Sequence, residues 1–363
     1  MIKNINVIDL FCGCGGFSKG FEQAGFSIAL GIDLWDDAIV TYRHNFPNTK
    51  TINNDIDVLG GQDLLNIAEI TANEVDVIIG GPPCQGFSLS GKRMLDDPRN
   101  KLYKSFVEMV EFIKPKLFVM ENVPGLIRLF NGRVKDEVIE DFTRIGYNVS
   151  MEQLSADEYG VPQQRKRVFF VGINTKKIHN TAWFPFPEAT HGRGKLPFVT
   201  SEDAISDLDF ISDEIALSEK THYELDAKTD YQEYMRKNSS ALLNHVATLH
   251  KERTKQIISM VPDGGNYKDL PHELWQTRKV NIAWTRMNSQ KPCFTIDTGH
   301  NHHFHYRANR VPTVRESARI QSFPDDFEFI GIKTSQLKQV GNAVPPLLAE
   351  EIAKSVLEVI ERG

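Results

Sequence analysis

Cysteine is scarce in this chain of 363 residues, which contains only Cys12, Cys14, Cys84 and Cys293. Four scattered cysteines are too few for a disulfide framework in a chain of this length, so we expect reduced thiols. The sequence also lacks any apolar run near the ~20 residues that span a bilayer. Its first residues, MIKNINVIDLF, are too short and too polar for a signal peptide. These absences predict a cytoplasmic protein, or a nuclear one if the host has a nucleus, with no membrane segment.

Positive charge is not in excess either, because the formal net charge is -6. The charges are nevertheless unevenly distributed. Residues 173–230 contain 6 Lys+Arg and 11 Asp+Glu, whereas residues 231–314 contain 12 Lys+Arg and 6 Asp+Glu. The second segment is also rich in His, Asn and aromatic residues. Such a segment suits a phosphate backbone, although a solvated surface with segregated charges is an equal alternative.

Apolar segments alternate with helical spacing in the first half of the chain. Strands are expected at INVIDLF (5–11), SIALGID (27–33), VDVIIGG (75–81), KLFVMENV (116–123) and RVFFVGI (167–173). Helices are expected at 16–25, at DDAIVTYRHNF (36–46) and at KLYKSFVEMVEFI (101–113). This alternation predicts an α/β fold with a parallel sheet covered on both faces.

The alternation ends near residue 173, and a long irregular stretch follows. Helical spacing returns at RESARIQ (315–321) and at PPLLAEEIAKSVLEVIERG (345–363). We therefore predict a catalytic, cofactor-binding domain at 1–172, a smaller irregular domain at 173–310, and a return to the first domain at 311–363.

A glycine-rich turn joins the first expected strand to the first expected helix in DLFCGCGGFSKGF. Gly13, Gly15 and Gly16 would let the backbone turn sharply and approach a ligand closely. Asp33 ends the next strand, where a carboxylate can bind both hydroxyls of a ribose. The dinucleotide spacing G-x-G-x-x-G fails at Ser18, and no Walker-type Gly-Lys-Ser/Thr occurs. A nucleoside cofactor without a pyrophosphate, such as S-adenosylmethionine, therefore fits best; a structural glycine turn is the alternative.

The segment VDVIIGGPPCQGFSLSG places Cys84 just past the carboxyl end of a parallel strand. Open α/β sheets bind their ligands at that edge, and the Gly-Gly-Pro-Pro turn would hold the thiol in place. Cys293 also follows a proline but lacks the strand and the paired glycines. We interpret Cys84 as a nucleophile and Cys293 as a buried structural cysteine, which is also the alternative for Cys84.

A cysteine at this turn has a chemical meaning. Amine-directed DNA methyltransferases carry an acidic or amide residue, Pro-Pro and an aromatic residue here. Carbon 5 of cytosine is a poor nucleophile, but a thiolate bonded to carbon 6 makes carbon 5 enamine-like and able to attack a sulfonium methyl group. The thiolate is the reactive form, so we expect cationic or helix-end fields that favour it.

Two further segments supply candidate catalytic groups. Glu121 stands at the end of the next expected strand, where it can face Cys84 and hydrogen-bond ring N3. Arg165 and Arg167 occupy alternate positions of an expected strand, hence one face, where they could bind the base O2 and a phosphate. A capping carboxylate and two solvated arginines are the alternatives.

Six stretches in this order resemble the motifs of the cytosine-C5 DNA methyltransferases. They are Phe-x-Gly-x-Gly-Gly at 11–16, Pro-Cys-Gln at 83–85, Glu-Asn-Val at 121–123, Gln-x-Arg-x-Arg at 163–167, RESARIQSFP at 315–324 and QVGNAVPP at 339–346. The resemblance implies a Rossmann-like, S-adenosylmethionine-dependent domain and DNA (cytosine-5-)-methyltransferase activity on a flipped base. It also implies a bacterial or phage modification enzyme, belonging to a restriction-modification system.

The resemblance assigns residues to the cofactor. Phe11 would stack on the adenine, Asp33 stands where many relatives have Glu, and Leu34 stands where some have Trp. The implied cofactor-binding residues are Phe11, Gly13, Gly15, Gly16, Asp33, Leu34, Asp55, Ile56, Pro83, Leu102 and Asn342. The implied catalytic residues are Cys84, Glu121, Arg165 and Arg167. The loop from Gln85 to about Asn100 would close over DNA, with Ser90 near a phosphate.

The irregular segment corresponds to the family's target-recognition domain, which implies double-stranded DNA with a specific site as the partner of a monomeric enzyme. Candidate reading segments are NHVATLHKERTKQ, PDGGNYKDLP and DTGHNHHFHYRANR. The histidines at positions 300, 302, 303 and 305 lack a matched Cys or His pair at zinc spacing, so we expect no metal.

Three other functions fit the sequence less well. An RNA methyltransferase of the same chemistry should need little duplex-reading apparatus, so the long insert disfavours it. A catalytically silent DNA-binding module would not need the intact set of Cys84, Glu121, Arg165 and Arg167. A nicotinamide oxidoreductase fails on the glycine spacing.

Overall fold

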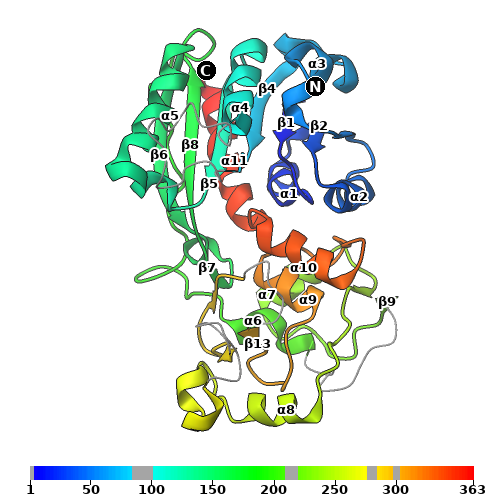
Figure 1. The fold of residues 1–363 in the computed structure, drawn as a ribbon. Helices are drawn as coiled ribbons and strands as arrows, with labels where there is room; N and C mark the ends of the chain where they lie inside the picture. Colours follow the sequence, from blue (N-terminus) through cyan, green and yellow to red (C-terminus); the bar gives the residue numbers. More distant parts are fainter. Residues whose placement is uncertain (1–3, 84–100, 209–219, 276–283, 297–302) are drawn as a thin grey trace. The chain divides into compact units, whose positions relative to one another are not determined.

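The computed structural model describes residues 4–83, 101–208, 220–275, 284–296 and 303–363 (Figure 1). Of Lys101 it describes the backbone and not the side chain. In that part of the chain, no helix combines the length and the apolar character needed to cross a membrane.

The described strands of the first half form a seven-stranded sheet in the order β3-β2-β1-β4-β5-β8-β6. Strands β1 to β5 are parallel, and β8 is antiparallel to both neighbours, β5 and β6. The bounds are β1 Asn6–Leu10, β2 Ser27–Asp33, β3 Lys50–Asn53, β4 Val75–Gly80, β5 Leu117–Asn122, β6 Tyr147–Ser155 and β8 Lys166–Asn174. The predicted α/β fold is confirmed. The reversal of β8 was not predicted; it arises because residues 156–165, without a crossover helix, connect β6 to β8.

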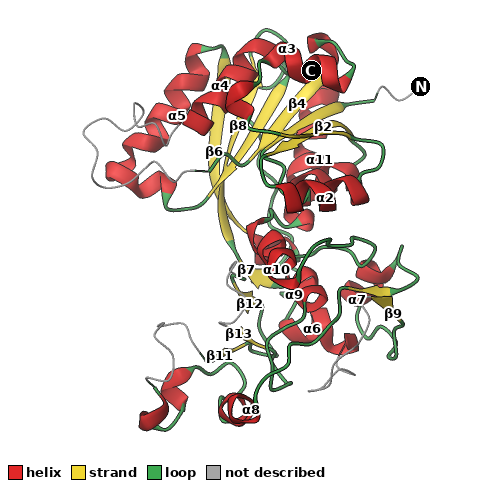
Figure 2. Cartoon of the chain, turned by 45° about the vertical axis from the view of Figure 1, so that its right-hand side comes forward, coloured by secondary structure: helices red, strands yellow, loops and turns green. Residues whose placement is uncertain are grey.

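Helices cover both faces of this sheet, as predicted. Figure 2 shows α3 (Gly61–Ala68), α4 (Lys101–Ile113) and α5 (Arg133–Arg144) on one face, with α2 (Asp36–Asn45) and α11 (Pro346–Arg362) on the other. Helix α1 (Gly16–Gln23) packs on the sheet through Phe17, whose ring meets that of Phe169 edge-on at 6.2 Å. Strand β4 is buried along its whole length, which explains why its residues are apolar apart from Asp76, whose carboxylate pairs with Lys116 (2.8 Å).

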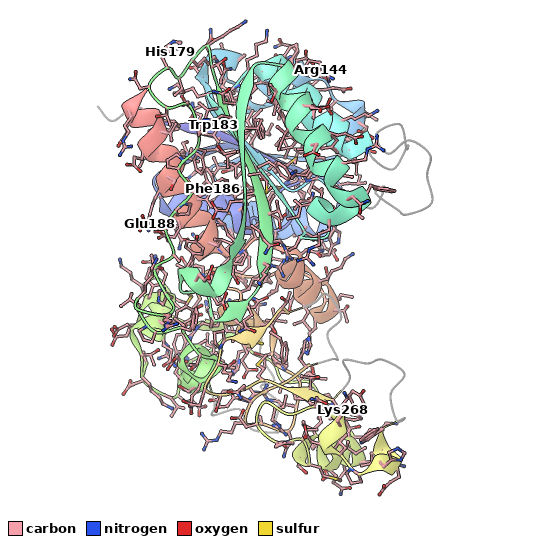
Figure 3. The ribbon with its side chains drawn as sticks, turned by 90° about the vertical axis from the view of Figure 1, so that its left-hand side faces the viewer. Arg144, His179, Trp183, Phe186, Glu188 and Lys268 are labelled. Atoms are coloured by element: carbon pink, nitrogen blue, oxygen red, sulfur yellow. The ribbon has the colours of Figure 1, made fainter. Side chains whose placement is uncertain are left out.

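The outer edge of the sheet, at β6, is accompanied by residues 178–188. Figure 3 shows this segment, with His179, Trp183, Phe186 and Glu188, running beside the sheet. The side chain of Asn148 in β6 donates to the carbonyl of Ala182 (3.1 Å), and the amide of Phe184 donates to Ser150 Oγ (2.9 Å). These two bonds hold the segment along the edge strand, and covering an edge limits its pairing with another chain.

The chain divides into two compact units. Unit 1 comprises residues 1–155, 166–188 and 348–363, and unit 2 comprises residues 156–165 and 189–347. The units differ from the three predicted ranges chiefly at 311–347, which belong to unit 2. The reason is helix α9 (Val314–Ile320), whose residues are all buried and whose arginines bind other segments of unit 2.

Unit 2 has little regular structure among its described residues. Its other helices are α6 Ser201–Ile205, α7 Asp230–Arg236, α8 Glu252–Ser259 and α10 Lys333–Asn342. Its strands are two residues long: β7 Gln163–Gln164, β9 Lys220–Thr221, β10 Leu242–Leu243, β11 Thr285–Arg286, β12 Cys293–Phe294 and β13 His303–Phe304. The predicted irregularity of this segment is thus observed.

Buried arginines of α9 connect the segments of unit 2. Arg315 donates to the carbonyls of Leu243 (3.0 Å), Pro324 (3.0 Å) and Phe327 (2.6 Å). Arg319 pairs with Asp207 and Asp325 and donates to the carbonyl of Ala204. These charge-assisted hydrogen bonds replace the ladders of a regular sheet as the internal framework.

Candidate active site

The glycine-rich turn between β1 and α1 has left-handed backbone at three positions. Phe11, Gly13 and Gly15 have φ of 63°, 52° and 101°. A Cβ added at Gly13 would meet nothing within 4 Å, whereas one at Gly15 would lie 2.4 Å from the Phe46 ring. Gly15 is therefore required by packing, and Gly13 leaves open space beside the turn that a ligand could use.

Asp33, at the end of β2, is fixed by the same turn. Its Oδ2 accepts from the amide of Gly13 (2.8 Å), and its Oδ1 accepts from the amide of Trp35 (2.8 Å). Burial raises the pKa of Asp33, and the hydrogen bonds from these backbone amides oppose that rise. A carboxylate oriented by two amides still has lone pairs for a ribose diol, so these residues fit a nucleoside.

Asn53, at the end of β3, is a supporting residue that the sequence analysis missed. Its side-chain amide donates to the carbonyls of Asp33 (3.3 Å) and Leu34 (3.2 Å). Leu34 itself is 67% exposed, although its side chain is apolar. The two bonds hold Leu34 where its side chain can pack on a bound ligand.

Three buried side chains joined by hydrogen bonds lie beneath the turn, and the sequence analysis did not predict them. Ser18 Oγ donates to Asp9 Oδ2 (2.6 Å) and lies 2.7 Å from the hydroxyl of Tyr42. A Cβ at Gly31 would lie 2.7 Å from the Tyr42 ring, so the ring packs directly on the backbone of β2. Asp9, Ser18 and Tyr42 thus connect β1, α1 and α2 beneath the turn. We call them the Asp9 cluster.

Four more of the residues implied for the cofactor have defined places in unit 1. Asp55 caps a short 3-10 helix at Ile56–Val58, where its Oδ1 accepts from the amide of Asp57 (3.1 Å). Ile56 is buried in the main core, and Phe11 and Leu102 pack against that core while partly exposed.

The carboxyl ends of β4 and β5 bring candidate catalytic groups together. Glu121 Oε1 forms an ion pair with Arg167 Nε at 2.7 Å, and both side chains are largely buried. Glu121 Oε2 lies only 3.0 Å from the Cβ position of Gly81. Any side chain at Gly81 would crowd Glu121, so the carboxylate lies directly against the turn that leads into Cys84. Cys84, Ser90 and the rest of the loop to Asn100 lie outside the described residues.

Asn122 connects the same two strand ends. Its side-chain amide donates to the carbonyl of Pro82 (3.0 Å), and its Oδ1 accepts from the amide of Val123 (2.9 Å). Pro82 is buried and Pro83 is exposed. The backbone is therefore anchored two residues before the predicted nucleophile, a function of the Glu-Asn-Val stretch that strand-end reasoning alone did not reveal.

Arg165 and Arg167 are not on one strand, contrary to the prediction. Arg167 lies in β8, whereas Arg165 falls in the break between β7 and β8 and belongs to unit 2. The Arg165 guanidinium is buried and donates to the carbonyl of Gly341 (2.9 Å). The prediction of one shared strand face fails because β8 begins at Lys166, so Arg165 lies outside the strand. Asn342, the neighbour of Gly341, is exposed at the end of α10.

Two of the four clustered histidines, His300 and His302, lie outside the described residues. His303 packs on the Phe294 ring, with centroids 4.0 Å apart, and His305 is buried 3.6 Å from Glu316. Within the described ranges, no three His, Cys, Asp or Glu side chains are grouped so as to hold a metal ion.

The described cysteines are all buried thiols. Burial raises the pKa of Cys14 to about 12 and raises the pKa values of Cys12 and Cys293 well above the usual range. Protonated, enclosed thiols are poor nucleophiles, which suits the predicted structural place of Cys293.

Comparison with known proteins relates this geometry to a function. The family model for "C-5 cytosine-specific DNA methylase" matches residues 5–358. The chain is 41% identical to the Type II methyltransferase M.DdeI of Desulfomicrobium norvegicum, over 97% of this chain and 88% of the relative. It is 40% identical to M1.HphI of Haemophilus parahaemolyticus, over 98% and 87%. A crystal structure described as a DNA modification methyltransferase encoded within an E. coli prophage matches with a TM-score of 0.80 at 28% identity, covering 99% of this chain and all of that one.

Proposed function

Because this chain belongs to the family of C-5 cytosine-specific DNA methylases, we propose that it methylates carbon 5 of a cytosine through a covalent bond between Cys84 and carbon 6. The observation that carries the proposal is the Glu121–Arg167 ion pair against the Gly81 turn. It places a carboxylate and a guanidinium together, with the carboxylate against the turn that leads into Cys84.

In the proposed reaction, the Cys84 thiolate adds to carbon 6 and the ring electrons move toward N3. Glu121 would hydrogen-bond the ring at N3, and Arg167 would hold Glu121 in position while binding the base O2. Carbon 5 would then take the methyl group, leaving S-adenosylhomocysteine. Loss of the carbon 5 proton to a base would break the carbon 6–sulfur bond and restore the aromatic ring and the thiolate. Each bond formed to Cys84 is therefore undone within one turnover.

S-adenosylmethionine is the proposed methyl donor, and its sulfonium supplies a methyl group that needs no metal or phosphate site. The turn at Gly13 and the fixed Asp33 carboxylate support this proposal, since both fit a nucleoside. The residues proposed to hold it are Phe11, Gly13, Gly15, Gly16, Asp33, Leu34, Asp55, Ile56, Pro83, Leu102 and Asn342.

The proposed substrate is a specific site in duplex DNA, from which the target cytosine is extruded, because a stacked base could not meet both the thiol and the methyl donor. Unit 2 is proposed to read the site. The Type II methyltransferases among the relatives support a place in a restriction-modification system. One chain per DNA site is expected.

The test uses the full chain with S-adenosylmethionine and DNA. Cys84→Ala should abolish methyl transfer while leaving DNA binding intact. A duplex whose target cytosine is 5-fluorocytosine should form a stable adduct with the wild type, because fluorine blocks the final elimination. Bisulfite sequencing of a treated plasmid supplies the site for this duplex. Methyl transfer to tRNA in place of DNA, or the absence of an adduct at a methylated site, would contradict the proposal.

A further inference from the structure

Asn342 is exposed, yet the backbone on both sides of it is held by buried side chains. Arg165 Nη2 donates to the carbonyl of Gly341 at 2.9 Å, and Gln321 Nε2 donates to the carbonyl of Ala343 at 2.6 Å. Arg165 is 1% exposed and Gln321 is 0% exposed. An exposed amide on so constrained a backbone is typical of a residue that must meet a ligand in one orientation.

The end of a helix explains why a guanidinium belongs there. Asn342 is the last residue of α10, and the final carbonyls of a helix have no partner within it. Arg165 satisfies one of them and places positive charge at the negative end of the helix dipole. A buried nitrogen of a guanidinium loses its bonds to water, so the bond from Arg165 Nη2 favours one position of the Gly341 carbonyl.

Gln163 supports the second contact. Its Nε2 donates to Gln321 Oε1 and to the carbonyl of Ile320, and its Oε1 accepts from the amide of Ile296 (3.0 Å). With its oxygen occupied by Gln163, the Gln321 amide must present its nitrogen to Ala343. Two residues of one short stretch, Gln163 and Arg165, therefore fix the carbonyls on both sides of Asn342.

We propose that Arg165 is a positioning residue that acts on the cofactor through Asn342, and that it contacts neither the base nor a phosphate. This inference rests on the proposed function, in which Asn342 contacts S-adenosylmethionine. It separates the roles of two arginines that the sequence pattern treats alike. Arg167 pairs with Glu121 at the reacting base, whereas Arg165 orients the side chain that follows Gly341.

A double-mutant cycle tests the inference, with S-adenosylmethionine affinity measured by calorimetry on the full chain. Asn342→Ala and Arg165→Met should each weaken binding about tenfold, the typical effect of losing one hydrogen bond to a charged or buried group. Because Arg165 acts through Asn342, the double variant should bind within about twofold of Asn342→Ala alone. An additive loss of about a hundredfold would overturn the inference. So would an Arg165→Met variant with unchanged cofactor affinity and slower adduct formation on the 5-fluorocytosine duplex.

Arg286 provides a matched control in the same unit. It is also buried and donates to backbone carbonyls, including those of Val261 (2.7 Å) and Ile258 (2.5 Å). Arg286→Met should lower stability without removing the effect of Asn342→Ala on cofactor affinity. If Arg165→Met does not fold, Arg165→Lys enters the same cycle and decides by the same criterion.

The outcomes also separate this inference from the proposed function. If Asn342→Ala binds S-adenosylmethionine as the wild type does while methylation continues, the role of Arg165 is refuted and the reaction stands. If the wild type binds no S-adenosylmethionine at all, the proposed function fails first.

Discussion

The Asp9 cluster makes a quantitative prediction about stability. Asp9 is 1% exposed in β1, and burial, opposed by the Ser18 hydrogen bond and assisted by Asp33, raises its pKa from 3.8 to about 8. The other titratable groups near it are Cys12, Cys14 and Tyr42, and none of the three is a cation. The carboxyl group is therefore neutral in the folded protein at pH 7 and ionised in the unfolded chain. Asp9→Asn removes this difference, because a carboxamide does not ionise.

The sign and size follow from proton linkage. Between pH 4 and 8 the unfolded chain binds fewer protons at Asp9 than the folded protein does, so the free energy of unfolding falls as pH rises. The stabilising contribution is complete below 3.8 and is lost by about pH 8. Each pH unit corresponds to about 1.4 kcal/mol, and about three units separate 3.8 from pH 7, so the loss at pH 7 is about 4 kcal/mol.

Urea unfolding of the wild type and Asp9→Asn at pH 5, 6, 7 and 8 measures the effect. The free energy of unfolding of the variant minus that of the wild type should rise by about 3 kcal/mol from pH 5 to pH 7. Any constant cost of the new amide cancels in this comparison. Ser18→Ala is the control, since it removes a hydrogen bond but leaves the acid, and should keep the wild-type slope. A difference between wild type and Asp9→Asn that does not change with pH would refute the reasoning.

Three other predictions concern the site and the DNA face. Asn122→Asp replaces the donor to Pro82 with an acceptor and should slow adduct formation with 5-fluorocytosine DNA about tenfold or more. Asn174→Asp is the control, because it loses an equivalent hydrogen bond to the Pro115 carbonyl, just before the opposite end of β5. It should lower stability without slowing adduct formation. Equally slow adduct formation in both variants would exclude positioning by Asn122. Brief iodoacetamide treatment of the folded protein should modify Cys84 first, as measured by peptide mass spectrometry. Cys12, Cys14 and Cys293 are buried, and early labelling of these three thiols would contradict their burial. Arg253→Ala removes an exposed cation of α8. If Arg253 contacts a DNA phosphate, the plot of log affinity for DNA against log salt concentration should become less steep by about 0.9. An unchanged slope would show that Arg253 does not contact DNA.

Much of unit 1 could be predicted from the sequence because its strands are short apolar runs that end at glycine, proline or acid. Asp33 and Glu121 lie at the ends of their strands as expected, and the alternation with helices predicts the parallel sheet. These features are local in the sequence, so a single pass along the chain finds them.

The missed features depend on contacts between distant residues. Asp9 and Tyr42 are ordinary residues of a strand and a helix until folding brings them to Ser18. Strand β6 mixes polar and apolar residues because one part of it faces the segment at 178–188, and its sequence resembles a loop. Arg165 reads as part of a strand because periodicity cannot show where the chain passes from one unit to the other.

The arginines of α9 have a consequence for how unit 2 can vary. Arg315 binds three carbonyl groups, and a carbonyl is the same whichever side chain its residue carries. These three hydrogen bonds therefore do not depend on which side chains stand at 243, 324 and 327, although the Phe327 ring also packs on Phe323 and Phe329. A scaffold that recognises main chain tolerates drift in neighbouring loops, which is the freedom a protein needs if new target sequences are to arise without rebuilding its interior.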